Sequence, residues 1–497
     1  MSRHIKRSGL EPAPDHSCPR PRKCNCVKRC GIFTATAIVA AILAGGPAAA
    51  QDSASARLEA LKAEINELRN EVEALKRDVA EGREEARGAT GQMAAAKTEP
   101  PADAPSIRVS SSNQPTICSS DGRNCISLTS RLQLDFGGYN YRPNTTATTP
   151  QNLVGGVIAR RAKFGVIGAF LNDWGYSIEF EGGGSGGGSG VVLDKAYLSY
   201  SGFEPFKIWA GILSVRYSLD RATSNNNITF MERAAPVEVA AGIGAATRSG
   251  FGITANERQW WAGAFLTGPA SGRTSHDARQ AAVTGRAVFL PVLTDRASLL
   301  IGSDVQYLFD APTGASELNL RDRIEMRIDG NRVLGTGGLP IDSARALSAE
   351  LAGTLGSFHF QGEYFDFNVE RPPGNGPSLN FSGYYIQGGY ILTGETRRYS
   401  ASSGSYGSVA PSRPFDWRMG DWGAWEIAAR YSMIDLNDRD IFGGRQENLT
   451  LGLNWYVNSN MRFIFNYING KVDKRTDSGG DIGARYQAVG ARMQIAL

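Results

Sequence analysis

Residues 449–467 read LTLGLNWYVNSNMRFIFNY. Apolar side chains fill every second position in each half of this stretch, and the positions between them are mostly small or polar. A period of two is the pattern of a β-strand that buries one face. The stretch therefore predicts two β-strands, 449–457 and 461–467.

The same period recurs through most of the chain. It is found at 132–136, 164–166, 174–180, 206–212, 299–307, 425–433 and 489–497. The segments last about nine to eleven residues, the length with which a tilted strand crosses a bilayer. A soluble β-sandwich also alternates, but here the second face is polar or charged on nearly every segment, as a water-filled lumen requires. We expect an all-β, transmembrane antiparallel β-barrel over residues 126–497, with about sixteen strands, plus or minus two, at about 20–25 residues per strand and turn.

The first fifty residues have the features of an export signal. Lys28 and Arg29 precede an apolar run, 32–43, which is followed by GGPAAAQ. This order predicts a signal peptide over 1–50, cleaved before Gln51. A permanent membrane helix is the alternative, although the glycines and proline after the run make it a poor span. Residues 1–50 hold eight basic and two acidic residues, so their removal changes the net charge from +4 to −2. The remaining chain gives no basis for nucleic-acid binding.

A heptad pattern follows the leader. Leu58, Ile65, Val72 and Val79 occupy position a, and Leu61, Leu68 and Leu75 occupy position d. Position e is basic and position g is acidic, which predicts a short parallel coiled coil within 51–87. Ile and Val at a with Leu at d favour dimers, whereas large channel-forming barrels are mostly trimers, and the sequence leaves the number of associated chains open. Residues 88–125 lose the periodicity and are interpreted as a linker.

Cysteine and histidine usage argues against an enzyme. Outside the leader the cysteines are Cys118 and Cys125, in CSSDGRNC, and after export they are expected to close a small disulfide loop, with two free thiols as the alternative. The histidines outside the leader are His276 and His359. Neither stands in a nucleophile motif or a metal-spaced cluster, so we expect no enzymatic activity, no cofactor and no metal.

Several stretches resemble the phosphate-selective porins of the O and P type. They are RRAKFGVIGAFLNDWGYSIEFE (160–181), DKAYLSY (194–200), ITFMERA (228–234), WEIAARYSMIDLND (425–438), GGRQENLTLGLNWYVNSNMRFIFNYI (443–468) and YQAVGARMQIAL (486–497). The resemblance implies a homotrimeric, sixteen-stranded outer-membrane channel that takes up anions such as phosphate. Outer-membrane barrels usually end on an aromatic residue, whereas the last residue here, Leu497, is apolar but not aromatic.

Inward-facing basic residues are the candidate anion-binding groups. The strands supply Arg161, Lys163, Lys195, Lys207 and Arg286, and the polar stretch 214–235 supplies Arg216, Arg221 and Arg233. We expect 214–235 to form the constriction, where low-dielectric walls focus the potential of a few charges. Family members carry a Lys-x-Pro-Phe-Ser-like stretch where this chain has Ser214 to Ser218, SVRYS. A weakly selective general porin, or an envelope tether that grips the cell wall through the coiled coil, therefore stays open. The expected partners are small anionic or polar solutes, outer-membrane lipids and two further copies of the chain.

Overall fold

The computed structural model describes residues 106–109, 114–144, 152–184, 190–244, 246–270, 279–313 and 317–497, together with six helical residues between 63 and 74. The predicted signal peptide (1–50) lies outside the described residues, and so does most of the predicted coiled coil (51–87). The chain divides into two compact units, 1–98 and 99–497. The second unit contains the barrel.

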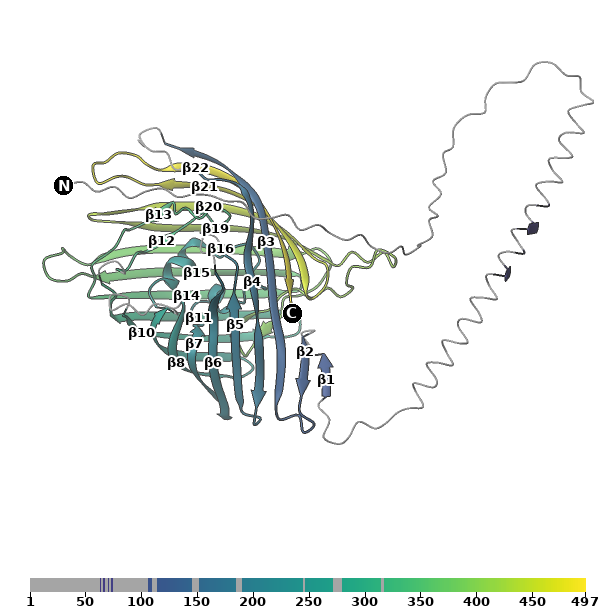
Figure 1. Ribbon diagram of the computed structural model, residues 1–497. Coiled ribbons are helices and arrows are strands. Elements are labelled where there is room, and N and C mark those ends of the chain that lie inside the picture. Colours follow the sequence, from purple (N-terminus) through teal and green to yellow (C-terminus); the bar gives the residue numbers. More distant parts are fainter. Residues whose placement is uncertain are drawn as a thin grey trace, which may run out of the picture. The chain divides into compact units, whose positions relative to one another are not determined.

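Sixteen strands form a closed antiparallel barrel (Figure 1). They are β3 (Cys125–Pro143), β4 (Gly156–Phe170), β5 (Trp174–Glu181), β6 (Val192–Phe203), β7 (Phe206–Ser214), β8 (Thr247–Asn256), β9 (Trp260–Ala270), β10 (Ala281–Leu293), β11 (Ala297–Asp310), β14 (Ser343–Leu355), β15 (Phe358–Glu370), β16 (Leu379–Ile391), β19 (Ala424–Asp438), β20 (Ile441–Tyr456), β21 (Met461–Asp473) and β22 (Ala484–Ala496). Each pairs with the next, and β22 returns to β3 from Ala484↔Pro143 to Ala496↔Arg131. This confirms the predicted barrel and its strand number.

The two faces of the wall differ as the alternation predicts. Along β14, for example, Leu347 and Leu351 are exposed on the outside, whereas Ser348 and Glu350 are buried toward the inside. Large apolar side chains on the outer face are stable when lipid surrounds them. The two strands predicted within 449–467 lie in β20 and β21, which pair with each other, for example Leu451 with Tyr467.

The connections distinguish the two ends of the barrel. Short turns such as 171–173, 204–205 and 257–259 join strands at one end, and long connections such as 144–155, 215–246 and 311–342 leave from the other. Barrels of this kind have short periplasmic turns and longer extracellular loops, so the long connections mark the extracellular end. The connection 392–423 is an exception, because it is long but leaves from the short-turn end.

Three connections fold into the barrel and build its core. They are 215–246, with helices α2 (Leu219–Ala222) and α3 (Ala235–Ala241); 311–342, with strands β12 (Arg321–Asp322) and β13 (Leu334–Gly335); and 392–423, with strands β17 (Tyr399–Ser400) and β18 (Ser405–Tyr406). Buried Leu219, Met231 and Val237 of the first connection belong to one apolar cluster with Ile324 and Met326 of the second. The lumen is therefore partly filled by apolar packing rather than open throughout.

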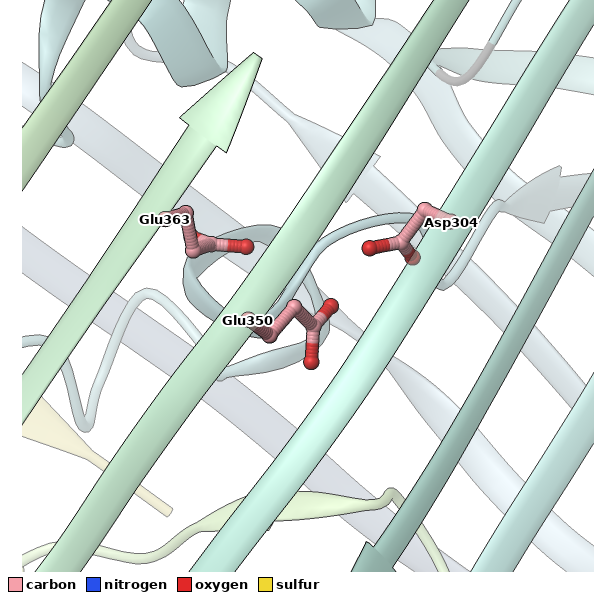
Figure 2. Close-up of side chains that lie close together, drawn as sticks. All are labelled: Asp304, Glu350 and Glu363. Atoms are coloured by element: carbon pink, nitrogen blue, oxygen red, sulfur yellow. The ribbon is translucent and has the colours of Figure 1, made fainter.

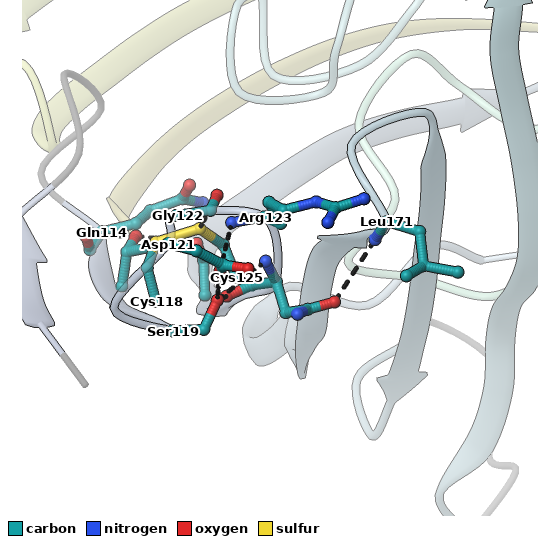
Figure 3. Close-up of a disulfide and its surroundings, with 11 residues drawn as sticks. Gln114, Cys118, Ser119, Asp121, Gly122, Arg123, Cys125 and Leu171 are labelled. Carbon is teal, nitrogen blue, oxygen red and sulfur yellow. Dashed lines mark hydrogen bonds between the residues drawn. A yellow bond between two sulfur atoms is a disulfide. The ribbon is translucent and has the colours of Figure 1, made fainter. Parts of the chain in front are cut away.

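A small disulfide-bonded hairpin precedes the barrel. Strands β1 (Ser106–Val109) and β2 (Pro115–Cys118) continue the sheet beyond β3. In the structure Cys118 and Cys125 are joined by a disulfide, shown in Figure 3. Residues 88–125 were interpreted as a linker, but their last part is ordered, because Ile117 and Ile126 pair across β2 and β3. None of the described helices is long and apolar enough to cross a membrane.

Candidate functional site

The stretch predicted to form the constriction, 214–235, lies inside the barrel. It begins at the end of β7 and is buried at Val215, Tyr217 and Leu219, and again from Ile228 to Ala234. The backbone N–H of Met231 donates to Asn466 Oδ1 on β21, 3.0 Å away. Such contacts with the far side of the wall show that the segment crosses the lumen.

Carboxylates of the wall hold the first turn of this segment. Asp304 on β11 accepts a hydrogen bond from the Ser218 N–H at 2.8 Å. Glu363 on β15 accepts from the N–H groups of Leu219 and Asp220, at 2.6 and 3.1 Å. The first N–H groups of a helix have no partner within the helix, so these two carboxylates satisfy donors that burial would otherwise leave unpaired.

Arg286 pairs with two carboxylates of the acidic cluster to which Asp304 and Glu363 belong. Figure 2 shows Asp304 and Glu363 together with Glu350 of β14. Arg286 on β10 lies 2.8 Å from the Glu350 carboxylate and 3.5 Å from Asp304, with the side chains of all three fully buried. It also donates to the carbonyl oxygen of Gly404, 2.8 Å away. The Arg286 side chain therefore links the barrel wall to the connection 392–423, and its guanidinium group is not free to bind an anion.

Glu232 holds the second half of the segment at the centre of four arginines. Its carboxylate oxygens lie 2.8 Å from Arg160 Nε, 2.7 Å from Arg492 Nη2, and 3.6 Å from both Arg161 Nη2 and Arg327 Nε. Burial alone would raise the pKa of the Glu232 carboxyl, but these guanidinium groups lower it well below its usual range. Glu232 therefore stays ionised and fixes the segment against β4 and β22.

A β-bulge explains why two consecutive arginines reach Glu232. Gln133 of β3 pairs with Arg161, and the next residue, Leu134, pairs with Ala159, so Arg160 is the extra residue on β4. A bulge re-aims the side chains around it. Strict alternation predicts that the Arg160 side chain points to the outer face, so the sequence alone did not identify Arg160 as a lumen residue.

A second bulge places an acid beside one of the predicted lysines, and a neighbouring strand places another acid beside a second lysine. Glu179 pairs with Lys195 and Phe180 with Leu193, which leaves Asp194 as the extra residue on β6. Lys163 lies 2.6 Å from Asp194, and Lys195 lies 2.9 Å from Glu179. The charges of both lysines are thus largely balanced within the lumen.

A cavity of about 640 Å³ lies between segment 215–246 and the wall of β3–β9. Its charged lining consists of nine basic and three acidic residues: Arg131, Arg160, Arg161, Lys163, Lys195, Arg216, Arg221, Arg233, Arg327, Glu181, Asp194 and Glu238. Hydroxyl-bearing Ser400, Ser403, Ser405 and Tyr406 of the connection 392–423 also line it. The cavity is strongly basic although residues 51–497 together carry a net charge of only −2.

Six of the eight basic residues singled out in the sequence meet at this cavity. They are Arg161, Lys163, Lys195, Arg216, Arg221 and Arg233. Lys207 is not part of the lining and stacks its ammonium group 4.6 Å from the ring centre of Trp209. Arg286 does not line the cavity either, because its guanidinium group is paired with Glu350 in the acidic cluster. The alternation had placed both residues inside correctly but could not show which inward positions border open space.

Three cations of the lining have no ion-pair partner among the described residues. Arg131 on β3 makes no ion pair, and its Nε has no hydrogen-bond partner. Arg216 donates to the carbonyl oxygen of Ser402. Arg233 donates to the carbonyl oxygens of Asp220 and Thr223, at 2.9 and 2.6 Å. Arg221, by contrast, is paired with Glu238 at 3.2 Å. The excess charge is therefore carried by Arg131, Arg216 and Arg233.

Comparison with known proteins places the barrel in a family. A family model described as phosphate-selective porin O and P matches residues 126–497. Porin O of Pseudomonas aeruginosa is 28% identical over 397 residues, which cover 73% of this chain and 87% of that protein. An uncharacterized protein of Caulobacter vibrioides is 28% identical over 382 residues, covering 73% of this chain and 72% of its own.

Two solved structures also align with the chain. OmpT, an outer membrane protein of Vibrio cholerae, aligns with a TM-score of 0.48 and 10% identity, over 76% of this chain and 98% of its own. An anion-selective porin from Comamonas acidovorans aligns with a TM-score of 0.45 and 13% identity, over 75% and 100%.

The family match begins within the first barrel strand and runs to the last residue, so it covers the whole barrel. Its members are channels rather than enzymes. The chain is therefore a member of the phosphate-selective porin O and P family, and its sixteen-stranded barrel is a channel of the outer membrane.

Proposed function

We propose that this chain is a passive channel for small hydrophilic anions, phosphate among them, and that the basic cavity beside segment 215–246 is its selective constriction. The observation that carries the proposal is the lining of nine basic and three acidic side chains in a lumen whose remaining charges are mostly paired. Low-dielectric walls focus such a potential and concentrate anions at that point.

The residue types of the cavity favour an oxyanion. Arg131, Arg216 and Arg233 have no carboxylate partner among the described residues, and a guanidinium group can bind phosphate with two parallel hydrogen bonds. The hydroxyl groups of the connection 392–423 can add donors and acceptors to a hydrated, protonated phosphate. The Lys-x-Pro-Phe-Ser-like stretch of the family is replaced by Ser214–Ser218, so we infer a broader anion preference, with Arg216 supplying the charge there.

The proposal is tested by single-channel recording in planar bilayers under a chloride gradient, followed by addition of phosphate. The full chain is compared with a triple variant, Arg131→Gln, Arg216→Gln and Arg233→Gln. We expect the parent to be anion-selective and to be blocked by millimolar or lower phosphate, and the triple variant to lose most of this selectivity and to need at least about tenfold more phosphate for block, because each buried cation contributes on the order of 1 kcal/mol.

Arg345→Gln is the matched control, since Arg345 is an exposed arginine on the outer face of β14. It should leave selectivity and block unchanged. Large, weakly selective conductance steps in the parent, indifferent to phosphate, would overturn the proposal and favour a general porin.

We further propose that the channel is a homotrimer and that the predicted coiled coil contacts the cell wall. The porin fold of the family supports the trimer. The heptad pattern of 57–80 supports a coiled coil that could reach the cell wall. Conductance steps in multiples of three would support the trimer. Loss of envelope attachment on deletion of 51–100, without loss of conductance, would support the tether.

A further inference from the structure

The outer face of the barrel carries a row of cations at the extracellular ends of β20, β21, β22 and β3. Lys471 pairs with Arg485, and Arg485 pairs with Arg142, so three basic residues lie directly opposite one another on adjacent strands. The row ends at Glu447, which pairs with Lys471. Side chains at such positions are about 5 Å apart at Cβ, and like charges there destabilise the sheet.

Protein groups balance only one end of this row. Glu447 lies 3.3 Å from Lys471 and 3.0 Å from Arg445. Arg485 and Arg142 are exposed, and no carboxylate of the described residues forms an ion pair with either of them. Two adjacent cations on the outer wall, Arg142 and Arg485, thus have no anionic partner. A bound anion would relieve the repulsion between them.

The rows beneath the cations change in character step by step. The next row toward the middle of the wall is Leu449, Asn469, Gln487 and Asn140, and the one below it is Leu451, Tyr467, Val489 and Gly138. Then follow Leu453, Phe465, Ala491 and Phe136. Rows on one face are about 6.7 Å apart, so the rows that lack amide side chains begin about 13 Å below the cations. Amides able to bond hydroxyl and amide groups lie between them.

The apolar rows contain a hollow. A groove of about 510 Å³ is lined by Phe136, Phe465, Tyr467 and Val489, with small Ala491 between them. A second hollow, of about 330 Å³, lies higher on the same strands and includes Asn469, Lys471 and Arg485 in its lining. Gly138 has open space where a side chain would stand. The small residues leave room for a chain-like apolar group between the aromatic rings.

We propose that this face is a binding site for one phosphorylated glycolipid of the outer leaflet, with its phosphate on Arg142, Lys471 and Arg485, its sugar on the amide row and an acyl chain in the groove. Basic groups next to a membrane-embedded surface bind anionic lipid headgroups. The order of phosphate, hydroxyl-bearing sugar and hydrocarbon matches the order of the rows. Because the row lies at the end of β3 from which a long connection leaves, the lipid belongs to the extracellular leaflet.

The test is native mass spectrometry of the full, detergent-purified protein titrated with bisphosphorylated lipid A. The triple variant Arg142→Gln, Lys471→Gln and Arg485→Gln should bind at least about tenfold more weakly, and Ala491→Phe, which fills the groove, should bind several-fold more weakly. Arg345→Gln is the matched control, because Arg345 is also exposed on the outer face but pairs with Tyr307 and Asn368 rather than with cations. It should bind like the parent.

Three further measurements decide between sources. Phosphatidylglycerol bound as tightly as lipid A would reduce the site to the general lipid belt and overturn the proposal. Displacement of lipid A by millimolar inorganic phosphate would make it a site for the free ion and overturn it equally. If the triple variant loses its oligomeric state while each copy still binds lipid A, the face is a contact between copies instead. Single-channel conductance of all variants should equal that of the parent, so the result is independent of the selectivity proposed for the lumen.

Discussion

Glu232 is the residue on which the position of the constriction segment depends most. It is buried between Arg160, Arg161, Arg327 and Arg492, which come from two strands of the wall and from a second inward connection. Glu232→Gln would leave these buried cations short of a carboxylate, and breaking a buried pair costs about 3–5 kcal/mol. We expect lower thermal stability and a larger, noisier conductance. Asp440→Asn removes an exposed carboxylate that pairs with Arg371, and it should cost less than about 1 kcal/mol. Equal melting temperatures for the two variants would contradict the role of Glu232.

The same residue predicts how the channel responds to acid. The pKa of Glu232 is lower in the folded protein than in the unfolded chain, so its stabilisation is fully present above the unfolded value and is lost as the pH falls through the folded one. In the folded parent the Glu232 carboxylate should therefore stay ionised at pH 4 and the conductance should be kept, while the stability that Glu232 supplies should decline steadily as the pH falls below the ordinary pKa of a glutamate. Glu232→Gln should lack this component of the acid transition. Unfolding followed by circular dichroism between pH 2 and 7 would measure both.

At the scale of elements, the connection 392–423 narrows the channel from the periplasmic end. Arg397 donates to Thr229 Oγ1 at 2.7 Å, and Gly404 accepts from Arg286, so the connection is bonded to both the constriction segment and the wall. The N–H of Ser412 donates to Glu395 at 2.9 Å, which closes the base of the excursion. Deletion of 396–411 should keep the barrel and raise single-channel conductance about twofold, since area sets flow through a water-filled pore. Deleting 477–479, in an exterior connection, is the control, and equal conductance in both would show that 392–423 does not restrict flow.

The disulfide-bonded hairpin is a separable element. Cys118 and Cys125 close the turn between β2 and β3, where Asn124 Oδ1 also accepts from the Leu171 N–H (Figure 3). The barrel strand β3 is held independently by β4 and β22. Cys118→Ser with Cys125→Ser should therefore increase hydrogen exchange in 106–124 while leaving exchange in the rest of β3 unchanged. Faster exchange throughout β3 would mean that the hairpin supports the barrel itself.

Period-two alternation predicted the strands because it depends only on neighbours in sequence, whereas the filling of the lumen depends on partners far along the chain. Met326 packs in one cluster with Met231, about a hundred residues away in the chain, and nothing local to it signals an inward connection. The two bulges at Arg160 and Asp194 could not be predicted locally either, because a bulge exists only relative to the pairing register with the neighbouring strand. The alternation of side chains along a strand predicted which basic residues point inward. Only the packed structure shows that Arg216 borders the cavity, whereas Arg286 is paired with a carboxylate.

For the whole molecule, closure of the barrel makes everything before β3 dispensable for the pore. The pairing of β22 with β3 leaves no open edge in the wall. Deleting 51–100 should therefore leave single-channel conductance and phosphate block unchanged. The heptad pattern favours pairs of helices, whereas the family fold leads us to propose three barrels, so the deletion also tests which one sets the assembly. Steps that stay in threes after deletion would mean that the barrels associate through their walls and that the coiled coil serves the cell wall. Single conductance steps after the deletion would mean that the coiled-coil helices hold the copies together and that their heptad sequence can form a three-helix coil.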